Sequence, residues 1–239
     1  MNRLLRTEYL QAMGIRQWLL REAPVRETGE PQPAGSVATA ATAPPPGDAV
    51  AGLDWPALEA RVANCSRCAL HETRTRTVFG TGNREADWLI IGEAPGADED
   101  RQGEPFVGRA GQLLTEMLKA AGYQRSEVFI TNILKCRPPR NRDPLPGEVA
   151  CCHDYLQRQI TLIGPRLILA VGRIAAHNLL QTETPIGRLR GRVHRYGAAG
   201  IPLVVTYHPA YLLRSPLEKR KSWEDLQLAL QVIRGQGPE

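Results

Sequence analysis

The run WLIIG at residues 88–92 decides the fold, because it is the first of four short and continuously apolar stretches. The other three are VFITN (128–132), LILAVG (167–172) and LVVTY (203–207). Continuous rather than alternating apolar runs of this length are typical of strands buried on both faces of a parallel sheet. The pattern therefore predicts a parallel sheet of about four strands, covered on both sides.

The segments between these runs have helical patterns. They are GRAGQLLTEMLKAAG (108–122), PGEVACCHDYLQRQITLIG (146–164) and GRIAAHNLL (172–180), and LEKRKSWEDLQLALQVIRG is expected to form a last helix. Strands that alternate with helices form βαβ units. We therefore expect an α/β fold, a three-layer α/β/α sandwich with a central four-stranded parallel sheet. Residues 187–197, GRLRGRVHRYG, are predicted to form a basic hairpin or loop outside the core.

The sequence before residue 54 differs in composition from the rest of the chain. Residues 1–21 carry apolar side chains roughly at helical spacing, which predicts a short amphipathic helix. Residues 22–53 are rich in Pro, Ala and Gly without periodicity, so we expect a disordered linker. Asp54 is a typical N-cap, so the folded domain is predicted to span residues 54–239. The N-terminal helix is interpreted as a loosely docked tail, in preference to a helix that binds an unknown protein partner.

Charge and composition narrow the class of protein. The 239 residues have a formal net charge of +5 and a pI near 9.1, which favours polyanionic partners without requiring them. No apolar run approaches the length of a membrane span, and the first residues lack the pattern of a signal peptide. We therefore expect a cytoplasmic, monomeric protein without a membrane segment.

The five cysteines indicate a metal or cluster site. Without an export signal they are expected to be reduced, which favours ligation over disulfides. Cys65 and Cys68 form a Cys-x-x-Cys pair, and Cys136 and Cys152 bracket a proline-rich loop further along the chain. Four sulfurs suit either tetrahedral zinc or an iron–sulfur cluster, and the spacing does not separate the two. Cys151 is an alternative to Cys152 at this point.

Polar side chains stand where three of the predicted strands end. Glu93 follows the first strand, Asn132 closes the second, and His208 follows the fourth. Because the carboxyl ends of parallel strands meet at one edge, where such folds bind ligands, these side chains are expected to converge. A strand-end asparagine taken alone more often caps a turn, so the convergence is what indicates a site.

Two further segments border this edge. The Gly-rich stretch at residues 92–111 is neither a dinucleotide fingerprint nor a phosphate loop, and its Phe106 suits either the core or stacking on a planar ligand. An asparagine amide near such a ring has donors and an acceptor that complement a uracil-like base. Arginine and lysine residues cluster at 137–142, 188–195 and 214–221, as contacts with a phosphate backbone would require, although charge runs are usually solvated surface.

Three motifs together resemble the family 4 uracil-DNA glycosylases, the iron–sulfur branch of that superfamily. They are GEAPGADEDRQGEPFVGRAG, then TNILKCRPP with a cysteine sixteen positions after its own, then HPAYLLR. The resemblance covers roughly residues 55–235. It implies an α/β/α fold, a [4Fe–4S] cluster, and a DNA repair enzyme that flips uracil out of single- or double-stranded DNA. Such an enzyme hydrolyses the N-glycosidic bond, releases uracil and leaves an abasic site.

The resemblance also implies roles for individual residues. The cluster ligands are matched by Cys65, Cys68, Cys136 and Cys152, which leaves Cys151 spare. The uracil pocket is matched by Gly92, Glu93, Ala94, Phe106, Asn132 and His208.

Within that pocket, Phe106 matches the ring that stacks on the flipped base, and Asn132 matches the amide that reads uracil. His208 matches the imidazole at the uracil O2, and Glu93 is the candidate to position or activate water. Leu212 matches the side chain that wedges into the base stack, and Arg214 is placed to hold a phosphate.

Other interpretations have different consequences. A non-catalytic DNA-binding or polymerase-associated module could keep the same fold and cluster, and a zinc-stabilised nucleotide-binding protein could keep the cysteines. A branch of the superfamily traps DNA covalently through a histidine in a basic insertion after the second motif. No histidine lies between Cys136 and Cys152 here, which favours turnover.

Overall fold

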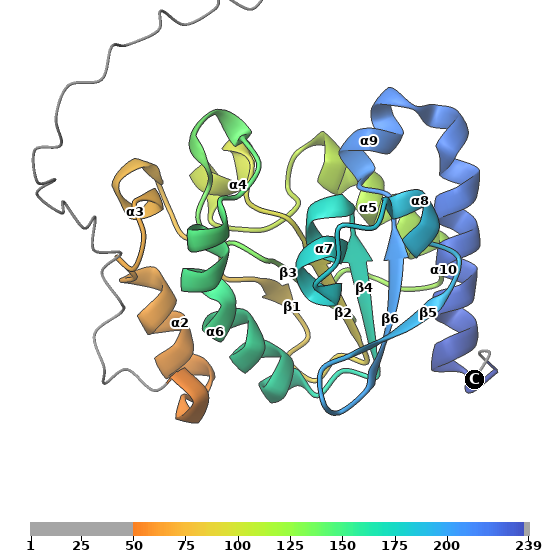
Figure 1. Cartoon of the computed structure of the whole chain (residues 1–239), viewed down its shortest axis with the longest axis horizontal. Coiled ribbons are helices and arrows are strands. Elements are labelled where there is room, and N and C mark those ends of the chain that lie inside the picture. The colour runs from red at the N-terminus through yellow and green to blue at the C-terminus, as the bar shows by residue number, and fades with distance from the viewer. Residues whose placement is uncertain (1–49, 237–239) are drawn as a thin grey trace, which may run out of the picture. The chain divides into compact units, whose positions relative to one another are not determined.

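The computed structural model of the chain describes residues 50–236 (Figure 1), so the predicted N-terminal helix and almost all of the predicted linker lie outside it. Folded structure is present before the predicted boundary at residue 54, because Val50–Gly52 forms a 3-10 turn (η1) whose Val50 side chain is buried. Asp54 is the N-cap of the next helix, as predicted, and its carboxylate accepts a hydrogen bond from the Ala57 N–H at 3.0 Å. No helix among the described residues is long and apolar enough to cross a membrane.

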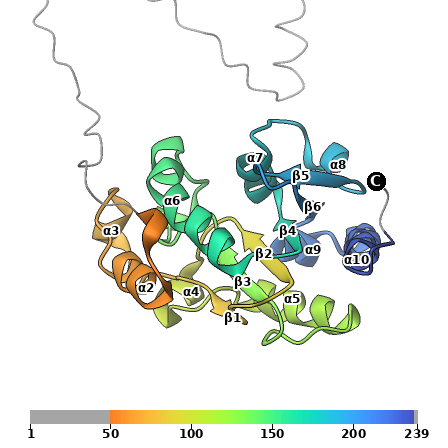
Figure 2. The same ribbon diagram turned by 90° about the horizontal axis from the view of Figure 1, so that it is seen from below.

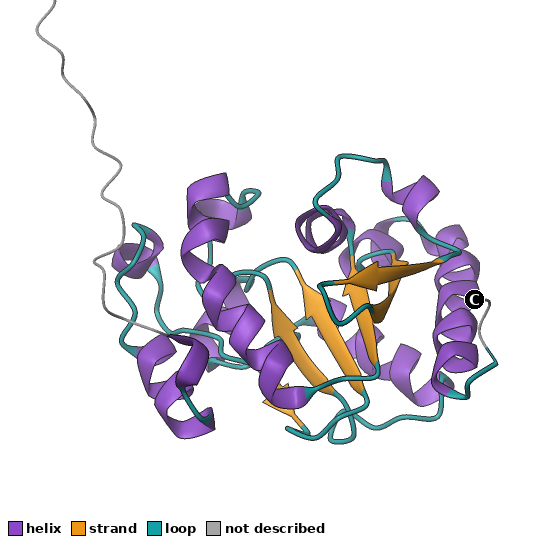
Figure 3. Cartoon of the chain, turned by 60° about the horizontal axis from the view of Figure 1, so that its bottom comes forward, coloured by secondary structure: helices purple, strands orange, loops and turns teal. Residues whose placement is uncertain are grey.

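One six-stranded sheet, in the order β1-β3-β2-β4-β6-β5, forms the centre of the fold, and its four inner strands are parallel (Figure 3). The strands are β1 (Thr81–Gly82), β2 (Trp88–Gly92), β3 (Phe129–Asn132), β4 (Leu167–Val171), β5 (Val193–Tyr196) and β6 (Ile201–Thr206). The inner strands are those that the four apolar runs predict, and every residue of β2, β3 and β4 is buried. The edge strands β1 and β5 run antiparallel to their neighbours. The segment 187–197, predicted to be a basic hairpin or loop outside the core, instead contributes β5, which pairs with β6 as an edge strand of the central sheet.

Helices cover both faces of the sheet, which confirms the predicted α/β/α layers (Figure 2). The larger helices are α2 (Trp55–Ala63), α5 (Arg109–Ala120), α6 (Pro146–Ile163), α7 (Arg173–Leu180) and α10 (Lys219–Ile233). Leu89 and Ile91 of β2 share one apolar cluster with side chains of α2, α6 and α7. Trp88 and Ile90 face the other way and share a second cluster with side chains of α5 and α10.

Short helices replace some of the predicted loops. They are α3 (Leu70–Thr73), α4 (Ala97–Gln102), α8 (Ile186–Leu189) and α9 (Pro209–Arg214), together with the 3-10 turns η2 (Pro139–Asn141) and η3 (Pro216–Glu218). The α4 sequence ADEDRQ has no apolar periodicity, so its helical character does not show in the hydrophobic pattern. Helix α9 contains most of the HPAYLLR motif, and His208 is its N-cap.

Candidate active site

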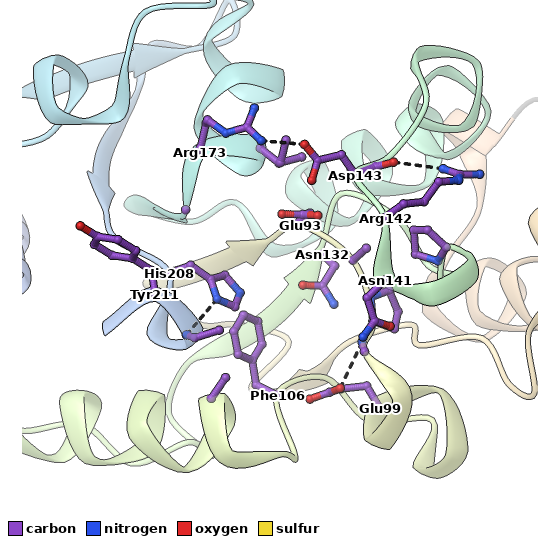
Figure 4. Close-up of a pocket in the computed structure, with 18 of the residues that line it drawn as sticks. Glu93, Glu99, Phe106, Asn132, Asn141, Arg142, Asp143, Arg173, His208 and Tyr211 are labelled. Carbon is purple, nitrogen blue, oxygen red and sulfur yellow. Dashed lines mark hydrogen bonds and ion pairs between the residues drawn. The ribbon is translucent and has the colours of Figure 1, made fainter. Parts of the chain in front are cut away.

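A cavity of about 770 Å³ lies at the carboxyl ends of the parallel strands, the edge where the sequence predicts a site (Figure 4). This volume is typical of a small-molecule site. The segments that follow β2, β3, β4 and β6 all contribute to its lining. Five of the predicted pocket residues line it, namely Glu93, Ala94, Phe106, Asn132 and His208. The structure therefore brings together side chains that are far apart in the sequence.

Gly92, the sixth predicted pocket residue, contributes by having no side chain. It ends β2 directly opposite Asn132 in the parallel ladder. A Cβ atom at Gly92 would lie 2.6 Å from Cζ of Phe106 and would also collide with the Asn132 amide. Glycine at this position therefore lets the aromatic ring and the amide lie together against the end of the strand.

Phe106 is held in an unusual backbone conformation. Its φ of 55° lies in the left-handed region, which costs energy for a residue with a side chain. Arg125 holds this conformation by donating hydrogen bonds to the carbonyls of Pro105 and Phe106, at 2.8 and 3.2 Å. Gly111 lies so close that a Cβ there would collide with the Phe106 carbonyl. The fixed ring is buried and stacks on the His208 ring, with 5.6 Å between centroids.

The Asn132 amide is buried and has an unpaired oxygen. The residue is 2% exposed, and its Oδ1 has no hydrogen-bond partner in the part of the chain that the structure describes. Buried polar atoms are nearly always paired, so an orphaned acceptor at a cavity wall indicates a place for a ligand donor. The side chain lies beside the Phe106 ring in Figure 4.

His208 has a defined proton arrangement. The Ala210 backbone N–H, in the first turn of α9, donates to Nδ1 of His208 at 3.1 Å. Burial, together with the positive charge of Arg214, lowers the pKa of His208 to about 4. The imidazole is therefore neutral at physiological pH, and because Nδ1 accepts, the proton lies on Nε2. Nε2 is thus a hydrogen-bond donor.

The pKa of Glu93 is shifted in the opposite direction, upward. Burial and, to a smaller extent, the negative charge of Asp143 raise the pKa of Glu93 to about 7, and the positive charge of Arg173 partly opposes this change. Asp143 and Arg173 form an ion pair of 2.6 Å at the rim of the cavity, beside the Glu93 carboxyl (Figure 4). A carboxyl group with a pKa near neutrality is suited to exchange a proton during a reaction.

Leu212, the predicted wedge, is not accessible at the surface of this structure. Leu212 is 1% exposed because it points from α9 into the protein interior. The exposed apolar side chains of α9 are Tyr211 at 36% and Leu213 at 37%. Tyr211 also lines the cavity, and its ring packs against that of Tyr207 with 5.0 Å between centroids. Arg214 is exposed and lines the cavity, where a phosphate contact requires it.

The four predicted ligand cysteines lie close to one another, beside the cavity. Cys68, Cys136 and Cys152 pack in one small apolar cluster. Burial raises the pKa of each of these thiols, that of Cys152 to about 12. Cys65 is close enough that its charge also raises the pKa of Cys68 and Cys136. Ala94 packs against this cluster as well as lining the cavity, so the two sites are adjacent.

Other features of the cysteine group bear on what it can bind. The thiol of Cys151 is turned to the Arg67 carbonyl, 3.1 Å away. Arg74 donates a hydrogen bond to Sγ of Cys136 at 3.1 Å. Among residues 50–236, no three His, Cys, Asp or Glu side chains are close enough together to hold a single metal ion.

Several residues of the cavity rim are absent from the sequence-based prediction. Asn141 and Asp143 come from the arginine-rich loop after β3, and Arg173 begins α7. Arg173 directly follows the third predicted strand, so the rule that sites lie at carboxyl ends would have found it. Tyr207 and Tyr211 flank His208 in the same way, but their aromatic character alone does not distinguish cavity from core.

Comparisons with known proteins agree with this geometry. The sequence profile of the uracil DNA glycosylase superfamily matches residues 79–227. A type-4 uracil-DNA glycosylase of Archaeoglobus fulgidus is 48% identical over 169 residues, which are 68% of this chain and 84% of that protein. A type-4 uracil-DNA glycosylase of Pyrobaculum aerophilum is 43% identical over 74% of this chain and 93% of its own length. A type-5 enzyme of Thermus thermophilus is 34% identical over 56% of this chain and 68% of its own length. The chain therefore belongs to the uracil-DNA glycosylase superfamily, and within it to the type-4 family.

Proposed function

We propose that the protein is a monofunctional uracil-DNA glycosylase of DNA repair. It extrudes uracil from DNA, hydrolyses the bond between base and sugar, and leaves an abasic site. The observation that carries the proposal is the convergence of Phe106, Asn132, His208 and Glu93 on one cavity at the strand ends. The type-4 relatives support the same substrate.

Phe106 and Asn132 select the base. The rigid Phe106 ring offers an aromatic face on which a flipped base stacks, an interaction of about 1–3 kcal/mol. The unpaired Oδ1 of Asn132 accepts from the uracil N3–H, while the amide NH₂ donates to O4. Cytosine has an acceptor at N3 and donors at N4, so the same amide orientation rejects it.

His208 stabilises the leaving group. Breaking the glycosidic bond places negative charge on the uracil ring and positive charge on the sugar. The Nε2–H of neutral His208 donates to the uracil O2 as this charge develops, and Ala210 keeps the imidazole in the required tautomer. Removing one such donor from an enzyme typically costs about 10²–10³-fold in rate.

Glu93 holds the proton of the attacking water. When ionised, its carboxylate accepts that proton and also opposes the positive charge on the sugar. Its raised pKa makes the carboxylate a stronger base than an exposed glutamate. Asp143 increases this basicity, because a second negative charge nearby favours the protonated form of Glu93.

DNA contacts come from the rim. Arg214 lies at the mouth of the cavity and contacts a phosphate beside the flipped nucleotide. Extruding the base costs a few kcal/mol, and an inserted side chain offsets part of this. Tyr211 fits this role better than Leu212, because Tyr211 is exposed at the cavity mouth whereas Leu212 is buried.

The cysteine group fits a [4Fe–4S] cluster. Cys65, Cys68, Cys136 and Cys152 are the proposed ligands, because three of them pack in one apolar cluster and Cys65 is near enough to raise the pKa of Cys136. Four thiolates are the usual ligand set of such a cluster. When bound, it supplies a rigid covalent anchor for both ends of the loop between Cys136 and Cys152. That loop contributes Asn141, Arg142 and Asp143 to the cavity wall.

The function is tested by release of uracil from oligonucleotides that contain one uracil, followed by alkaline cleavage of abasic sites. We expect turnover by the wild type, and a loss of about 10²–10³-fold in His208→Ala and Asn132→Ala. His153→Ala, at an exposed position of α6, is the matched control and should retain full activity. Binding without base release, or a protein–DNA adduct that survives denaturation, contradicts the proposal.

The pH dependence of the reaction reports the ionisation of Glu93. Because the ionised carboxylate is the active form and its pKa is about 7, kcat/KM should rise from pH 5 and level off above pH 8. His208, with a pKa of about 4, should add no second inflection in this range.

Two variants check that Glu93 is the group responsible. Glu93→Gln should lower the rate by about 10²-fold and remove the pH dependence. Asp143→Asn should move the midpoint to lower pH, since it removes a negative charge that raises the Glu93 pKa. An unchanged profile in both variants would show that another group titrates.

Side-chain insertion is tested by comparing duplex with single-stranded substrates. Tyr211→Ala should reduce release from the duplex about tenfold more than from single strands, because only the duplex has a base stack to fill. Leu213→Ala, equally exposed on the same helix, is the matched control. Leu212→Ala should instead lower the free energy of unfolding by about 2–5 kcal/mol, since it leaves a cavity. If Leu213→Ala lost more duplex-specific activity than Tyr211→Ala, Leu213 rather than Tyr211 would be the inserted side chain.

The metal content tests the cluster. Protein purified without oxygen should contain iron and acid-labile sulfide and absorb visible light. Serine at any one of the four proposed ligands should lower the iron content. Cys151→Ser should leave the iron unchanged, because the Cys151 thiol is directed to the Arg67 carbonyl. Zinc in place of iron would contradict this assignment.

A further inference from the structure

The loop between α8 and β5 is fixed by a buried ion pair. Asp225 of α10 is fully buried, and the side chain of Arg190 is 12% exposed. Two nitrogens of the Arg190 guanidinium contact the two carboxylate oxygens of Asp225, each at 3.0 Å. The Gly191 N–H donates to the same carboxylate at 3.1 Å. Bidentate pairs of this kind have a fixed geometry, so the loop is held against the first half of α10.

The register of the sheet places this loop at the edge that carries the cavity. Strand β5 begins at Val193, which pairs with Val204 near the carboxyl end of β6. Residues 188–192 therefore lie at the edge where His208 follows β6. Ile186 of α8 lines the cavity itself, so the loop and the cavity are neighbours. Figure 1 shows α8, α9 and the beginning of α10 together at this edge, at the upper right.

The arginines of this loop differ in where their side chains lie. Arg190 and Leu189 pack inward, whereas Arg188 and Arg192 on either side of them are exposed. In the described part of the chain, residues 50–236, neither exposed guanidinium forms an ion pair. The loop therefore presents two free cations to solvent from a backbone that the buried pair holds in place.

The surface around the loop has an excess of positive charge. From α8 to the first half of α10, residues 186–225 carry eight basic and three acidic side chains. Each of the acidic side chains forms an ion pair with a basic one, and the pairs are Asp225–Arg190, Glu224–Arg220 and Glu218–Lys221. The other five basic side chains are Arg188, Arg192, Arg195, Arg214 and Lys219. Glu183, just before α8, offsets at most one of them.

DNA is the polyanion that fits this surface. Its backbone carries regularly spaced negative charges, and exposed arginine and lysine side chains bind them without regard to sequence. Under the proposed function, the cavity holds one nucleotide of a longer strand. The backbone on the flanks of that nucleotide must then pass over the surface next to the cavity, where the free cations lie.

We propose that the loop of residues 188–192 docks the phosphate backbone of the DNA beside the cavity, with Arg188 and Arg192 as the contacts. Arg190 touches no DNA and is a positioning residue, because it and Asp225 hold the loop in place. The inference rests on the proposed function for the nucleotide in the cavity, whereas the docking itself requires only DNA.

The double variant Arg188→Ala, Arg192→Ala tests the contacts in the full-length protein. Its affinity for a long duplex without uracil is measured by fluorescence anisotropy at a series of salt concentrations. The slope of log K against log salt should become less steep by about 1.8, because each phosphate contact contributes about 0.9. KM for a uracil-containing duplex should rise while kcat is kept, since neither side chain lines the cavity.

Lys119→Ala, Arg234→Ala is the matched control. It removes the same two charges from exposed positions near the C-terminal ends of α5 and α10, whose N-terminal ends face the cavity edge. Its slope should match that of the wild type. A wild-type slope in Arg188→Ala, Arg192→Ala overturns the proposal, and so does an equal change in the control, since it would reflect net charge alone.

A second double variant tests the supporting pair. Arg190→Met, Asp225→Leu replaces the ion pair with apolar side chains, an exchange that proteins often accept without loss of stability. The net charge stays the same, so a slope that is less steep by about 0.9, the equivalent of one contact, would come from the position of the loop. A wild-type slope in the folded variant overturns the positioning role of Arg190.

The outcome for the proposed function is separate. If the wild type released no uracil from any DNA, that function would fail. The salt dependence on a duplex without uracil would still decide whether Arg188 and Arg192 contact the backbone.

Discussion

The parallel pairing of β2 with β3 is the constraint on which the site depends. The ladder places Gly92 opposite Asn132, and backbone hydrogen bonds continue past the strand ends through Ile133 and Leu134. The Glu93 carboxyl and the Asn132 amide, 39 positions apart in the sequence, therefore lie at one edge of the sheet. Backbone hydrogen bonds join the two segments that carry them. The other residues of the site either line the cavity at this edge or hold its walls in place.

Burial at this edge has opposite consequences for the two titrating groups. Both are removed from water, which disfavours their charged forms. His208 consequently becomes neutral at physiological pH, whereas Glu93 gains affinity for a proton. A neutral donor suits the O2 of a departing uracil anion, and a more basic carboxylate suits a water molecule that must lose a proton. One physical effect, burial, thus gives each group the protonation behaviour that its proposed role in the reaction needs.

The sequence predicts the inner sheet and the main pocket residues because both follow from strong local patterns. Four continuous apolar runs are sufficient to predict the four inner strands. The positions at which these strands end are sufficient to predict that Glu93, Asn132 and His208 line one site. The rest depends on tertiary contacts. Whether Leu212 or Tyr211 faces outward is decided by the rotation of α9 on its neighbours, which the motif HPAYLLR does not specify. Helix α4 and edge strand β1 lack a hydrophobic period, so the sequence pattern does not predict them.

Rigidity explains why so much of the supporting structure is polar and buried. Phe106 keeps a costly backbone conformation because Arg125 and the close approach of Gly111 leave it no alternative. The buried amine of Lys135 is likewise held in place by hydrogen bonds to three acceptors. Apolar packing would give the fold more stability at these positions, but it tolerates small shifts of the groups it surrounds. Hydrogen bonds with fixed directions do not, and the proposed discrimination between uracil and cytosine, which depends on one pair of polar atoms, requires that precision.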